Sequence, residues 1–249
     1  MARSGHTGQD EQLFNIRDAA NFLKVSQITL RRWTKSGALP CYRIGGKRER
    51  RFRLKDLQGL LEGGKFQEMI SLGYGSLMVP DGSHMTHFYS SEAEAFEVST
   101  RSVSEGLDQG EGVMVVIPPE KMDDFSRELA SYGRPLDHDL ESGRLLFSSG
   151  MDSPDDMVRH LASFIEKQKR FRLVGDMVWA LRRGWDINAF DRLERSAGLI
   201  PAAKRWTILC QYSLKDFSGA HIMMAAEYHD HIIYKGDLEK SPYSNLREG

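Results

Sequence analysis

The fold of the amino-terminal part is decided by residues 15–61, which read NIRDAANFLKVSQITLRRWTKSGALPCYRIGGKRERRFRLKDLQGLL. Asn15 is a favourable amino-terminal helix cap, and apolar residues follow it with helical spacing. Ser26 is a second cap of this kind after a short turn. The pattern therefore predicts two short helices, the second of which reaches about Ser36.

The second helix divides into an apolar side and a polar side. We expect Ile28, Leu30 and Trp33 to point into a small core. The polar side chains are expected to face solvent, and they are Gln27, Thr29, Arg31, Arg32 and Lys35. Gly37 follows and is suited to a left-handed carboxyl-terminal cap, so we expect the helix to end there.

A hairpin and a third helix complete the predicted amino-terminal domain. Residues 41–44 and 51–54 alternate polar and apolar side chains, and the turn between them is rich in glycine and basic residues. This pattern predicts a β-hairpin, and a third helix is expected from about Asp56. The hairpin tip carries several guanidinium groups, which suit it to meet phosphate oxygens.

The charge of the chain is strongly uneven. Residues 15–65 hold thirteen Lys and Arg against four Asp and Glu, a local net charge of +9, whereas the whole chain carries −1. The rest of the chain therefore sums to −10. A basic segment attached to an acidic body predicts nucleic-acid binding by that segment alone, with a solvated basic surface as the alternative.

This segment resembles the winged helix-turn-helix of the MerR and excisionase-like families. The resemblance rests on Ala19-Ala20, the TLRRW and GALP stretches at 29–33 and 37–40, and Arg51-Phe52-Arg53 leading into Asp56-Leu57. It implies a recognition helix in the major groove, a wing over the adjacent backbone, and a homodimer on a pseudo-palindromic operator. The expected DNA contacts are Thr29, Arg31, Arg32, Lys35, Lys47, Arg48, Arg50 and Arg51.

The whole chain has the composition of a soluble globular protein, with 249 residues, 40% of them hydrophobic. No apolar run approaches the roughly 18 residues of a membrane helix. Two cysteines exclude a disulfide framework and predict a cytoplasmic protein. We expect a tail at 1–12, a winged helix-turn-helix domain at 13–64, a glycine-rich linker at 65–83, a sensory domain at 84–240 and a tail at 241–249.

The larger domain alternates helix-like and strand-like blocks. Helical spacing covers residues 92–107, 122–132, 157–169 and 190–199, and apolar strand-like runs cover 112–117, 144–147, 171–174 and 206–212. The run at 112–117 is apolar throughout, which is typical of a strand buried on both faces. The alternation predicts an α/β fold, a three-layer domain with a mainly parallel sheet.

Residues of this domain are similar to the MEDS domain, a sensory domain of methanogens and methylotrophs. The resemblance covers about 86–234 and rests on the following blocks: His87-Phe88-Tyr89-Ser90, Gly110-Glu111-Gly112, Val174-Gly175-Asp176-Met177-Val178, Leu209-Cys210-Gln211-Tyr212 and Glu227-Tyr228-His229. Since the family is similar to RecA-type ATPase cores, the resemblance implies a RecA-like fold and a sensory role.

Ligands of such sheets bind outside the carboxyl ends of the strands, which directs attention to the residues around these ends. The arginine and aspartate at 183 and 186 also have a spacing seen in cyclic-dinucleotide sites. The candidate ligand-binding residues are His87, Tyr89, Asp176, Trp179, Arg183, Asp186, Cys210, Tyr212 and His229. For the aromatic members, packing of the sheet is the alternative.

Other chemistry is not indicated by the sequence. The strand ending at Ile117 is followed by prolines and Glu120, which cannot form a phosphate-binding P-loop. His221, His229 and His231 match no metal-binding motif, so we predict no metal, no cofactor and no catalytic residue.

The sequence therefore predicts a one-component transcription regulator that binds operator DNA and a small ligand, a hydrophobe or a nucleotide. Two alternatives stay open. One is a protein that binds a cyclic dinucleotide or ATP through the RecA-like body. The other is an architectural DNA-binding protein that senses no ligand.

Overall fold

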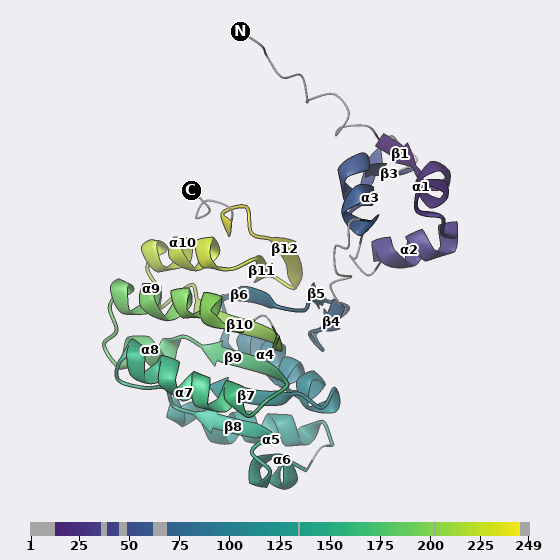
Figure 1. Ribbon diagram of the computed structural model, residues 1–249. Helices are drawn as coiled ribbons and strands as arrows, with labels where there is room; N and C mark the ends of the chain where they lie inside the picture. The colour runs from purple at the N-terminus through teal and green to yellow at the C-terminus, as the bar shows by residue number, and fades with distance from the viewer. Residues whose placement is uncertain are drawn as a thin grey trace. The chain divides into compact units, whose positions relative to one another are not determined.

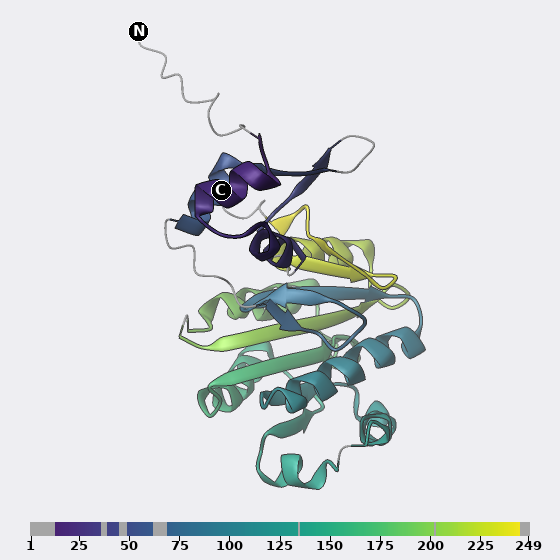
Figure 2. The ribbon, with the colours of Figure 1, turned by 90° about the vertical axis from the view of Figure 1, so that its right-hand side faces the viewer.

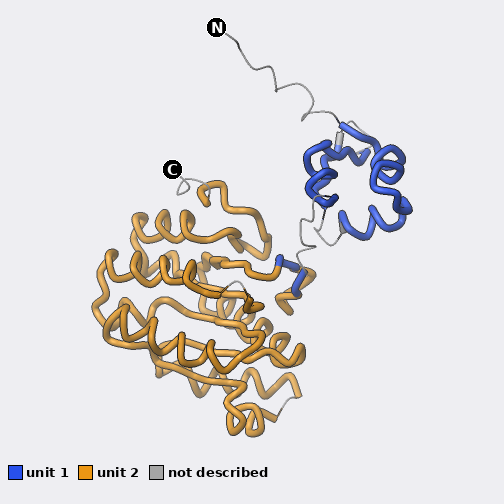
Figure 3. The backbone as a smooth tube through the Cα atoms, viewed as in Figure 1, with its two compact units in different colours: residues 1–70, 78–80 blue, residues 71–77, 81–249 orange. Residues whose placement is uncertain are grey.

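The computed structural model describes residues 13–35, 39–44, 49–61, 69–133, 135–201 and 203–244. The chain divides into two compact units. The amino-terminal unit comprises residues 1–70 and 78–80, and the carboxyl-terminal unit comprises residues 71–77 and 81–249 (Figure 3). In the described part of the chain, no helix is both long and apolar enough to cross a membrane.

The amino-terminal unit has the helix-turn-helix and hairpin that the sequence predicts. Its elements are β1 (Leu13–Asn15), α1 (Ile16–Leu23), α2 (Gln27–Lys35), β2 (Tyr42–Ile44), β3 (Glu49–Arg53) and α3 (Leu54–Leu61). β3 pairs antiparallel with both β2 and β1, and the strand β1 was not predicted. The predicted cap at Gly37 and the turn at 45–48 lie outside the described residues.

Both predicted helix caps are confirmed. The Asn15 side chain accepts hydrogen bonds from the amides of Arg17 and Asp18 at 2.8 and 3.0 Å. The amide of Thr29 donates to the Ser26 hydroxyl at 3.1 Å. These side chains satisfy amides that have no partner in the first turn of a helix. The core beneath the helices consists of Ala19, Ala20, Leu23, Leu30, Leu39, Phe52 and Leu57.

The inward orientation predicted for Ile28 is wrong. Its side chain is 78% exposed, whereas Leu30 is fully buried and Trp33 packs against the core. The reason is the helical period: residues two apart point in nearly opposite directions, while residues three apart share a face. Ile28 therefore lies on the solvent face of α2, together with the arginines.

The carboxyl-terminal unit contains a seven-stranded sheet with the strand order β12-β11-β6-β10-β9-β7-β8. Neighbouring strands are parallel except for β12, which pairs antiparallel with β11. The strands are β6 (Ser83–Tyr89), β7 (Gly112–Val116), β8 (Leu145–Ser148), β9 (Arg170–Asp176), β10 (Arg205–Ser213), β11 (His231–Tyr234) and β12 (Asp237–Lys240).

Helices cover both faces of this sheet (Figure 1). On one face lie α7 (Pro154–Glu166), α8 (Val178–Arg182), α9 (Ile187–Ser196) and α10 (Gly219–Tyr228), and on the other lie α4 (Glu92–Asp108) and α5 (Met122–Ser131). Figure 2 shows the same layers from the side. The shorter helices are η1 (Pro119–Lys121), α6 (Asp137–Glu141) and η2 (Ala197–Leu199). The predicted three-layer α/β architecture with a mainly parallel sheet is confirmed.

The strand β6, which lies between β11 and β10 inside the sheet, is the main element that the sequence pattern did not predict. All seven of its residues are buried, although Ser83, His84, Thr86 and His87 are polar. A strand with so many polar residues does not look buried in sequence. The region predicted as a linker also contains a short hairpin of β4 (Met69–Ser71) and β5 (Met78–Pro80).

A buried ion pair ties the sheet to α4. Arg172 on β9 is 1% exposed and donates from Nε to Glu111 at 2.8 Å. Its two terminal nitrogens donate to the carbonyl oxygens of Ser102 and Ser71 at 2.8 and 3.0 Å. Because a buried guanidinium is costly unless its donors are satisfied, we interpret this group as structural.

Candidate functional site

The first candidate site is the solvent face of α2. Arg31 and Arg32 are exposed on this helix, one turn after the exposed Ile28. Thr29, also expected to contact DNA, is half-buried, and its hydroxyl lies 2.9 Å from that of Ser26. The face therefore presents two exposed guanidinium groups beside an apolar side chain, a combination that suits phosphate oxygens and the thymine methyl group.

The predicted wing contributes fewer free charges in the described residues. Arg51 donates to Glu49 at 2.8 Å, and Arg50 is half-buried. The neighbouring Arg53 guanidinium lies 4.4 Å from the centre of the Tyr42 ring. The predicted contacts Lys47 and Arg48, and the side chain of Lys35, lie outside the described residues.

The second candidate site is a cavity of about 450 Å³ in the carboxyl-terminal unit, between the sheet and helices α7 and α9. Its walls are predominantly apolar, with contributions from Met157 and Leu161 on α7, Leu193 on α9, and Leu173 and Ile208 on the sheet. Cavities of this size and character are typical of small-molecule sites. The cavity thus offers an apolar molecule a place inside the domain.

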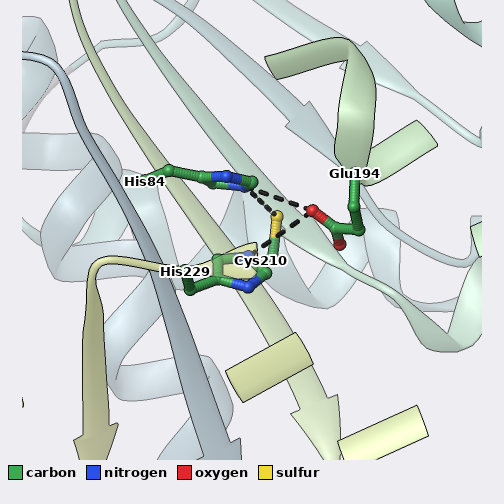
Figure 4. Close-up of side chains that lie close together, drawn as sticks. All are labelled: His84, Glu194, Cys210 and His229. Atoms are coloured by element: carbon green, nitrogen blue, oxygen red, sulfur yellow. Dashed lines mark hydrogen bonds and ion pairs between the residues drawn. The ribbon is translucent and has the colours of Figure 1, made fainter. Parts of the chain in front are cut away.

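One wall of this cavity carries a polar group that consists of His84, Glu194 and Cys210, with His229 behind them (Figure 4). We call these four residues the buried quartet. His84 Nε2 lies 3.3 Å from Glu194 Oε2 and 3.5 Å from Cys210 Sγ. His229 Nε2 lies 3.6 Å from the same glutamate oxygen. Figure 4 shows all four side chains directed at one point.

The interior position of the quartet shifts the pKa values of its members. Burial, and then His229, lower the pKa of His84 well below its usual value, which keeps the ring neutral. Burial, and then Glu194, raise the pKa of the Cys210 thiol well above its usual value. The same two causes, in that order, raise the pKa of Tyr212.

Surrounding groups hold the quartet in place. The Tyr212 hydroxyl donates to Glu194 Oε1, so the other carboxylate oxygen is left to face the histidines. His229 Nδ1 lies 2.6 Å from the carbonyl oxygen of Ala225, which can only accept a hydrogen bond. Nδ1 therefore donates to this carbonyl oxygen, and Nε2 is the ring nitrogen that faces the rest of the quartet.

A third polar group lies at the carboxyl ends of β6 and β9, where the sequence predicted a ligand. Asp176 accepts hydrogen bonds from the Tyr89 hydroxyl at 3.1 Å, from Lys121 Nζ at 3.0 Å and from the Val178 amide at 3.3 Å. Glu92 lies 2.9 Å from the same lysine nitrogen. These groups satisfy one another, so the arrangement is that of a structural cluster.

Electrostatics agree with this interpretation. Burial lowers the pKa of Lys121, but Asp176 and Glu92 outweigh burial and raise it above the usual value. Burial and then Asp176 raise the pKa of Tyr89. The lysine is therefore charged and matched by two carboxylates, and it has little attraction left for a phosphate group.

The other predicted residues have separate environments. His87 contacts Gln211 at 3.0 Å and Glu94 at 3.5 Å. Arg183 pairs with Asp152, and Asp186 caps α9 by accepting from the Ala189 amide at 2.9 Å. The structure thus gives the arginine and aspartate of the supposed dinucleotide motif local roles.

The predicted residues are only partly brought together. Trp179 and Cys210 line the cavity, and Tyr212 and His229 contact the residue Glu194 on its wall. Sequence reasoning missed His84 and Glu194. The glutamate did leave a signal, because it shares one face of α9 with the apolar Phe190 and Leu193. A charged residue within an apolar stripe is a candidate for an interior site.

The topology also shows that the loop to compare with a P-loop follows another strand than the one ending at Ile117. The sheet's first strand in chain order is β6, so the strand-loop-helix unit to compare with a P-loop is β6 followed by α4. Only Ser90 and Ser91 separate these elements, and the serine hydroxyl at 91 caps α4 at 3.2 Å from the Glu94 amide. Two residues without glycine or lysine cannot form the eight-residue phosphate cradle.

Comparison of the sequence with known protein families shows the family of this chain. Residues 83–230 match the family described as the MEthanogen/methylotroph, DcmR Sensory domain, and residues 13–65 match a helix-turn-helix domain. The chain belongs to the MEDS family and combines its sensory domain with a helix-turn-helix. This combination defines a DNA-binding regulator.

Individual proteins resemble the chain over most of its length. It is 29% identical to the transcriptional repressor DcmR of Methylorubrum extorquens, a match that covers 89% of this chain and 91% of that protein. The flagellar accessory protein FlaH of Methanocaldococcus jannaschii is similar in structure, with a TM-score of 0.52, 16% identity, and coverage of 68% of this chain and 83% of FlaH. A KaiC-like protein of Pyrococcus horikoshii gives a TM-score of 0.54 and 17% identity, over 67% of this chain and 80% of that one. These structures show that the fold is RecA-like.

Proposed function

We propose that this protein is a one-component transcription regulator whose apolar cavity binds a small ligand and thereby changes its affinity for operator DNA. The observation that carries the proposal is the cavity of about 450 Å³ in a chain that also has a helix-turn-helix. Since the relative described above is a transcriptional repressor, repression is the role we propose here.

For the DNA, α2 acts in this proposal as the recognition helix of a MerR-like or excisionase-like winged domain. Arg31 and Arg32 contact phosphates or base edges, and Ile28 beside them packs on base methyl groups. The protein acts as a homodimer, with half-sites about one helical turn, roughly 34 Å, or a multiple of it apart. The ion pair between Arg51 and Glu49 engages one wing arginine, so α2 supplies the main contacts among the described residues in this proposal.

For the ligand, the walls favour an apolar molecule with one polar group. The cavity is lined mainly by aliphatic side chains of α7, α9 and the sheet. Its polar lining residues are His84, Glu194 and Cys210 of the buried quartet, together with Glu166, Ser196 and Lys204. Such a site takes a small hydrocarbon derivative more readily than a nucleotide, because the lysine in its lining, Lys204, already donates to the carbonyl oxygens of Ile165, Glu166 and Gln168. A ligand acts on DNA affinity only through a difference in its affinity for two states, typically 1–3 kcal/mol.

We further propose that the RecA-like body does not hydrolyse nucleotides. The short connection between β6 and α4 supports this, as does the pairing of Lys121 with Asp176 and Glu92. Incubation of purified protein with ATP and operator DNA should release no phosphate above background. Steady turnover that depends on the protein would contradict the proposal.

The test of the sensing proposal combines thermal stability with DNA binding. Small hydrocarbons and their alcohols of increasing size, and nucleotides in parallel, are screened for stabilisation of the protein. A compound that raises the melting temperature is then added to a fluorescence-anisotropy titration with the promoter fragment of the protein's own gene. We expect it to weaken DNA binding by about 5- to 150-fold, in keeping with typical coupling energies.

A variant that fills the cavity provides the control. Gly175 lines the cavity, and a Cβ atom added there would make only ordinary contacts, the nearest at 3.5 Å from the sulfur of Met177. Gly175→Leu should abolish the stabilisation and keep DNA binding. Gly198→Ala, where a Cβ meets nothing within 4 Å, should behave like the wild type. Equal stabilisation of Gly175→Leu and the wild type would show that the ligand binds elsewhere.

A further inference from the structure

The buried quartet has the composition and shape of a metal site. His84 comes from β6, Glu194 from α9, Cys210 from β10, and His229 from the residue after α10. All four are at least nine-tenths buried, and one ligand atom from each lies within 4.8 Å of the others. We propose that the quartet binds one Zn²⁺ ion through two imidazole nitrogens, a thiolate and a carboxylate oxygen. This proposal is independent of the regulatory function above.

The distances fit tetrahedral coordination. Zinc bonds of about 2.0–2.3 Å to N, O and S ligands place neighbouring ligand atoms about 3.3–3.7 Å apart at the corners of a tetrahedron. In the quartet, Glu194 Oε2 lies 3.3 Å from His84 Nε2 and 3.6 Å from His229 Nε2. Cys210 Sγ lies 3.5 Å from His84 Nε2. These three edges already have the lengths that a central ion requires.

His229 gives a second, independent indication. Its Nε2 is buried and has no hydrogen-bond partner among the described residues, although a buried polar atom normally has one. Its Nδ1 donates to the Ala225 carbonyl oxygen, so Nε2 is the ring nitrogen directed at the other three residues of the quartet. An imidazole that is oriented by a backbone carbonyl and directs its other nitrogen inward is the usual form of a histidine ligand.

The charges of the quartet also favour a cation. Glu194 is 4% exposed, and its partners in the described part of the chain are Tyr212, His84 and His229, none of which carries a permanent positive charge. An isolated buried carboxylate is strongly unfavourable. A divalent ion would neutralise this carboxylate together with a Cys210 thiolate, and binding would release the thiol proton.

The ligand types select the kind of metal. Calcium and magnesium prefer an all-oxygen environment, which the quartet does not provide. Imidazole and thiolate ligands suit zinc and its transition-metal neighbours, among which cobalt(II) takes the same geometry. Because His84, Glu194 and Cys210 also line the cavity, the ion would form part of the cavity wall.

The test uses the full-length protein and Co²⁺ as a spectroscopic probe for Zn²⁺. Protein stripped with a chelator is titrated anaerobically with Co²⁺, and the visible spectrum is recorded. We expect saturation at one ion per chain, strong visible bands of tetrahedral cobalt, and a near-ultraviolet thiolate-to-cobalt band. Addition of Zn²⁺ should abolish these bands by displacement, and metal analysis of the untreated protein should find zinc.

Variants assign the bands to the quartet. Cys210→Ser should lose the thiolate band, and His229→Ala should lose tetrahedral binding. Tyr212→Phe removes the hydroxyl that orients Glu194 and should weaken metal binding about 10- to 100-fold. The matched controls are Cys41→Ser and His138→Ala, which change the other cysteine and an exposed histidine of α6. Both should bind like the wild type.

Three results would overturn the proposal. The first is that wild-type protein with an intact circular dichroism spectrum binds no Co²⁺ or Zn²⁺ at micromolar concentration. The second is that the cobalt spectrum of the wild type lacks a thiolate band. The third is that the band survives Cys210→Ser and disappears with Cys41→Ser. The first two results come from the wild type alone, so they stand even if a variant fails to fold. All of these measurements are made without DNA, so they leave the proposed regulatory function to its own test.

Discussion

The two units use polar residues in opposite ways. In the amino-terminal unit the arginines of α2 stand exposed over a small apolar core, and the chemistry is on the surface. In the carboxyl-terminal unit the decisive polar residues are inside: Arg172 with Glu111, and the buried quartet on the wall of an apolar cavity. A surface site can be recognised from the local composition of the sequence, whereas an interior site becomes visible only when the fold is known.

The comparison has a physical basis. Binding to a polyanion needs many cations on one face, and each of them tolerates water and substitution. An interior polar group is stable only if its partners are placed correctly, so its energetic importance depends on contacts between distant segments. Substitutions of charged residues should therefore affect binding in the first unit and stability in the second.

The largest expected effect tests whether buried charged residues stabilise the carboxyl-terminal unit. Arg172→Ala breaks a buried ion pair: it leaves Glu111 with Arg170 and removes the donor to the Ser102 and Ser71 carbonyl oxygens. It should lower the free energy of unfolding of the carboxyl-terminal unit by about 3–5 kcal/mol. Urea denaturation followed by tryptophan fluorescence measures this loss. Arg127→Ala, which breaks an exposed pair with Asp124, should cost less than about 0.5 kcal/mol. Equal small losses for both variants would remove the distinction between the units.

The next effect tests whether the exposed arginines of α2 contribute to DNA binding and not to stability. Arg32→Ala should weaken binding to operator DNA by about 1–3 kcal/mol, roughly 5- to 150-fold, and leave the unfolding transition unchanged. Fluorescence anisotropy at several salt concentrations separates the two kinds of contact, because loss of a phosphate contact also lowers the salt dependence. Arg127→Ala serves again as the control. Unchanged affinity at moderate salt would mean that α2 does not face the DNA.

A smaller effect tests whether local capping stabilises the first unit. Asn15→Ala removes the acceptor for the amides of Arg17 and Asp18 and should cost about 1 kcal/mol of stability. The fluorescence of Trp33, which packs on the core of that unit, follows the transition. Asn188→Ala, at an exposed position in α9, should cause no loss. Equal destabilisation by both changes would contradict the capping role.

The smallest effect distinguishes the sequence prediction from the structure at one residue. Ile28→Ala should change stability by less than about 0.5 kcal/mol because the side chain is 78% exposed. Leu30→Ala, in the core, should cost about 2–5 kcal/mol. Chemical denaturation of both variants decides the question. A large loss of stability for Ile28→Ala would indicate that this side chain packs in the core. Weaker DNA binding without loss of stability would support its place on the DNA-binding face.

Much of the fold follows from the sequence because it depends on local periodicity. The apolar run at 112–117 became the buried strand β7, and the helical spacing at 92–107 became α4. The strand β6 was not predicted because its polar residues contact neighbours far away in the chain: His84 contacts Glu194, and His87 contacts Gln211. Secondary-structure propensity depends on the local sequence and contains no information about such distant partners.

The candidate site was predictable only in part for the same reason. Cys210 and His229 were found through blocks of the family resemblance, while His84 and Glu194 have no fixed spacing to them. The four residues come from separate elements of the sheet and of the helical layer above it. Only the order of the strands, which puts β6 beside β10, brings them together.

The strands that carry His84 and Cys210 begin at the same place. Asp81, two residues before β6, accepts hydrogen bonds from the side chain of Arg205 at 2.8 Å and from the amide of Trp206 at 2.9 Å, at the start of β10. Asp81 immediately follows Pro80, the last residue assigned to the amino-terminal unit. Sliding of β10 past β6 would therefore break both hydrogen bonds of Asp81, so this aspartate helps to hold the register that brings Cys210 beside His84.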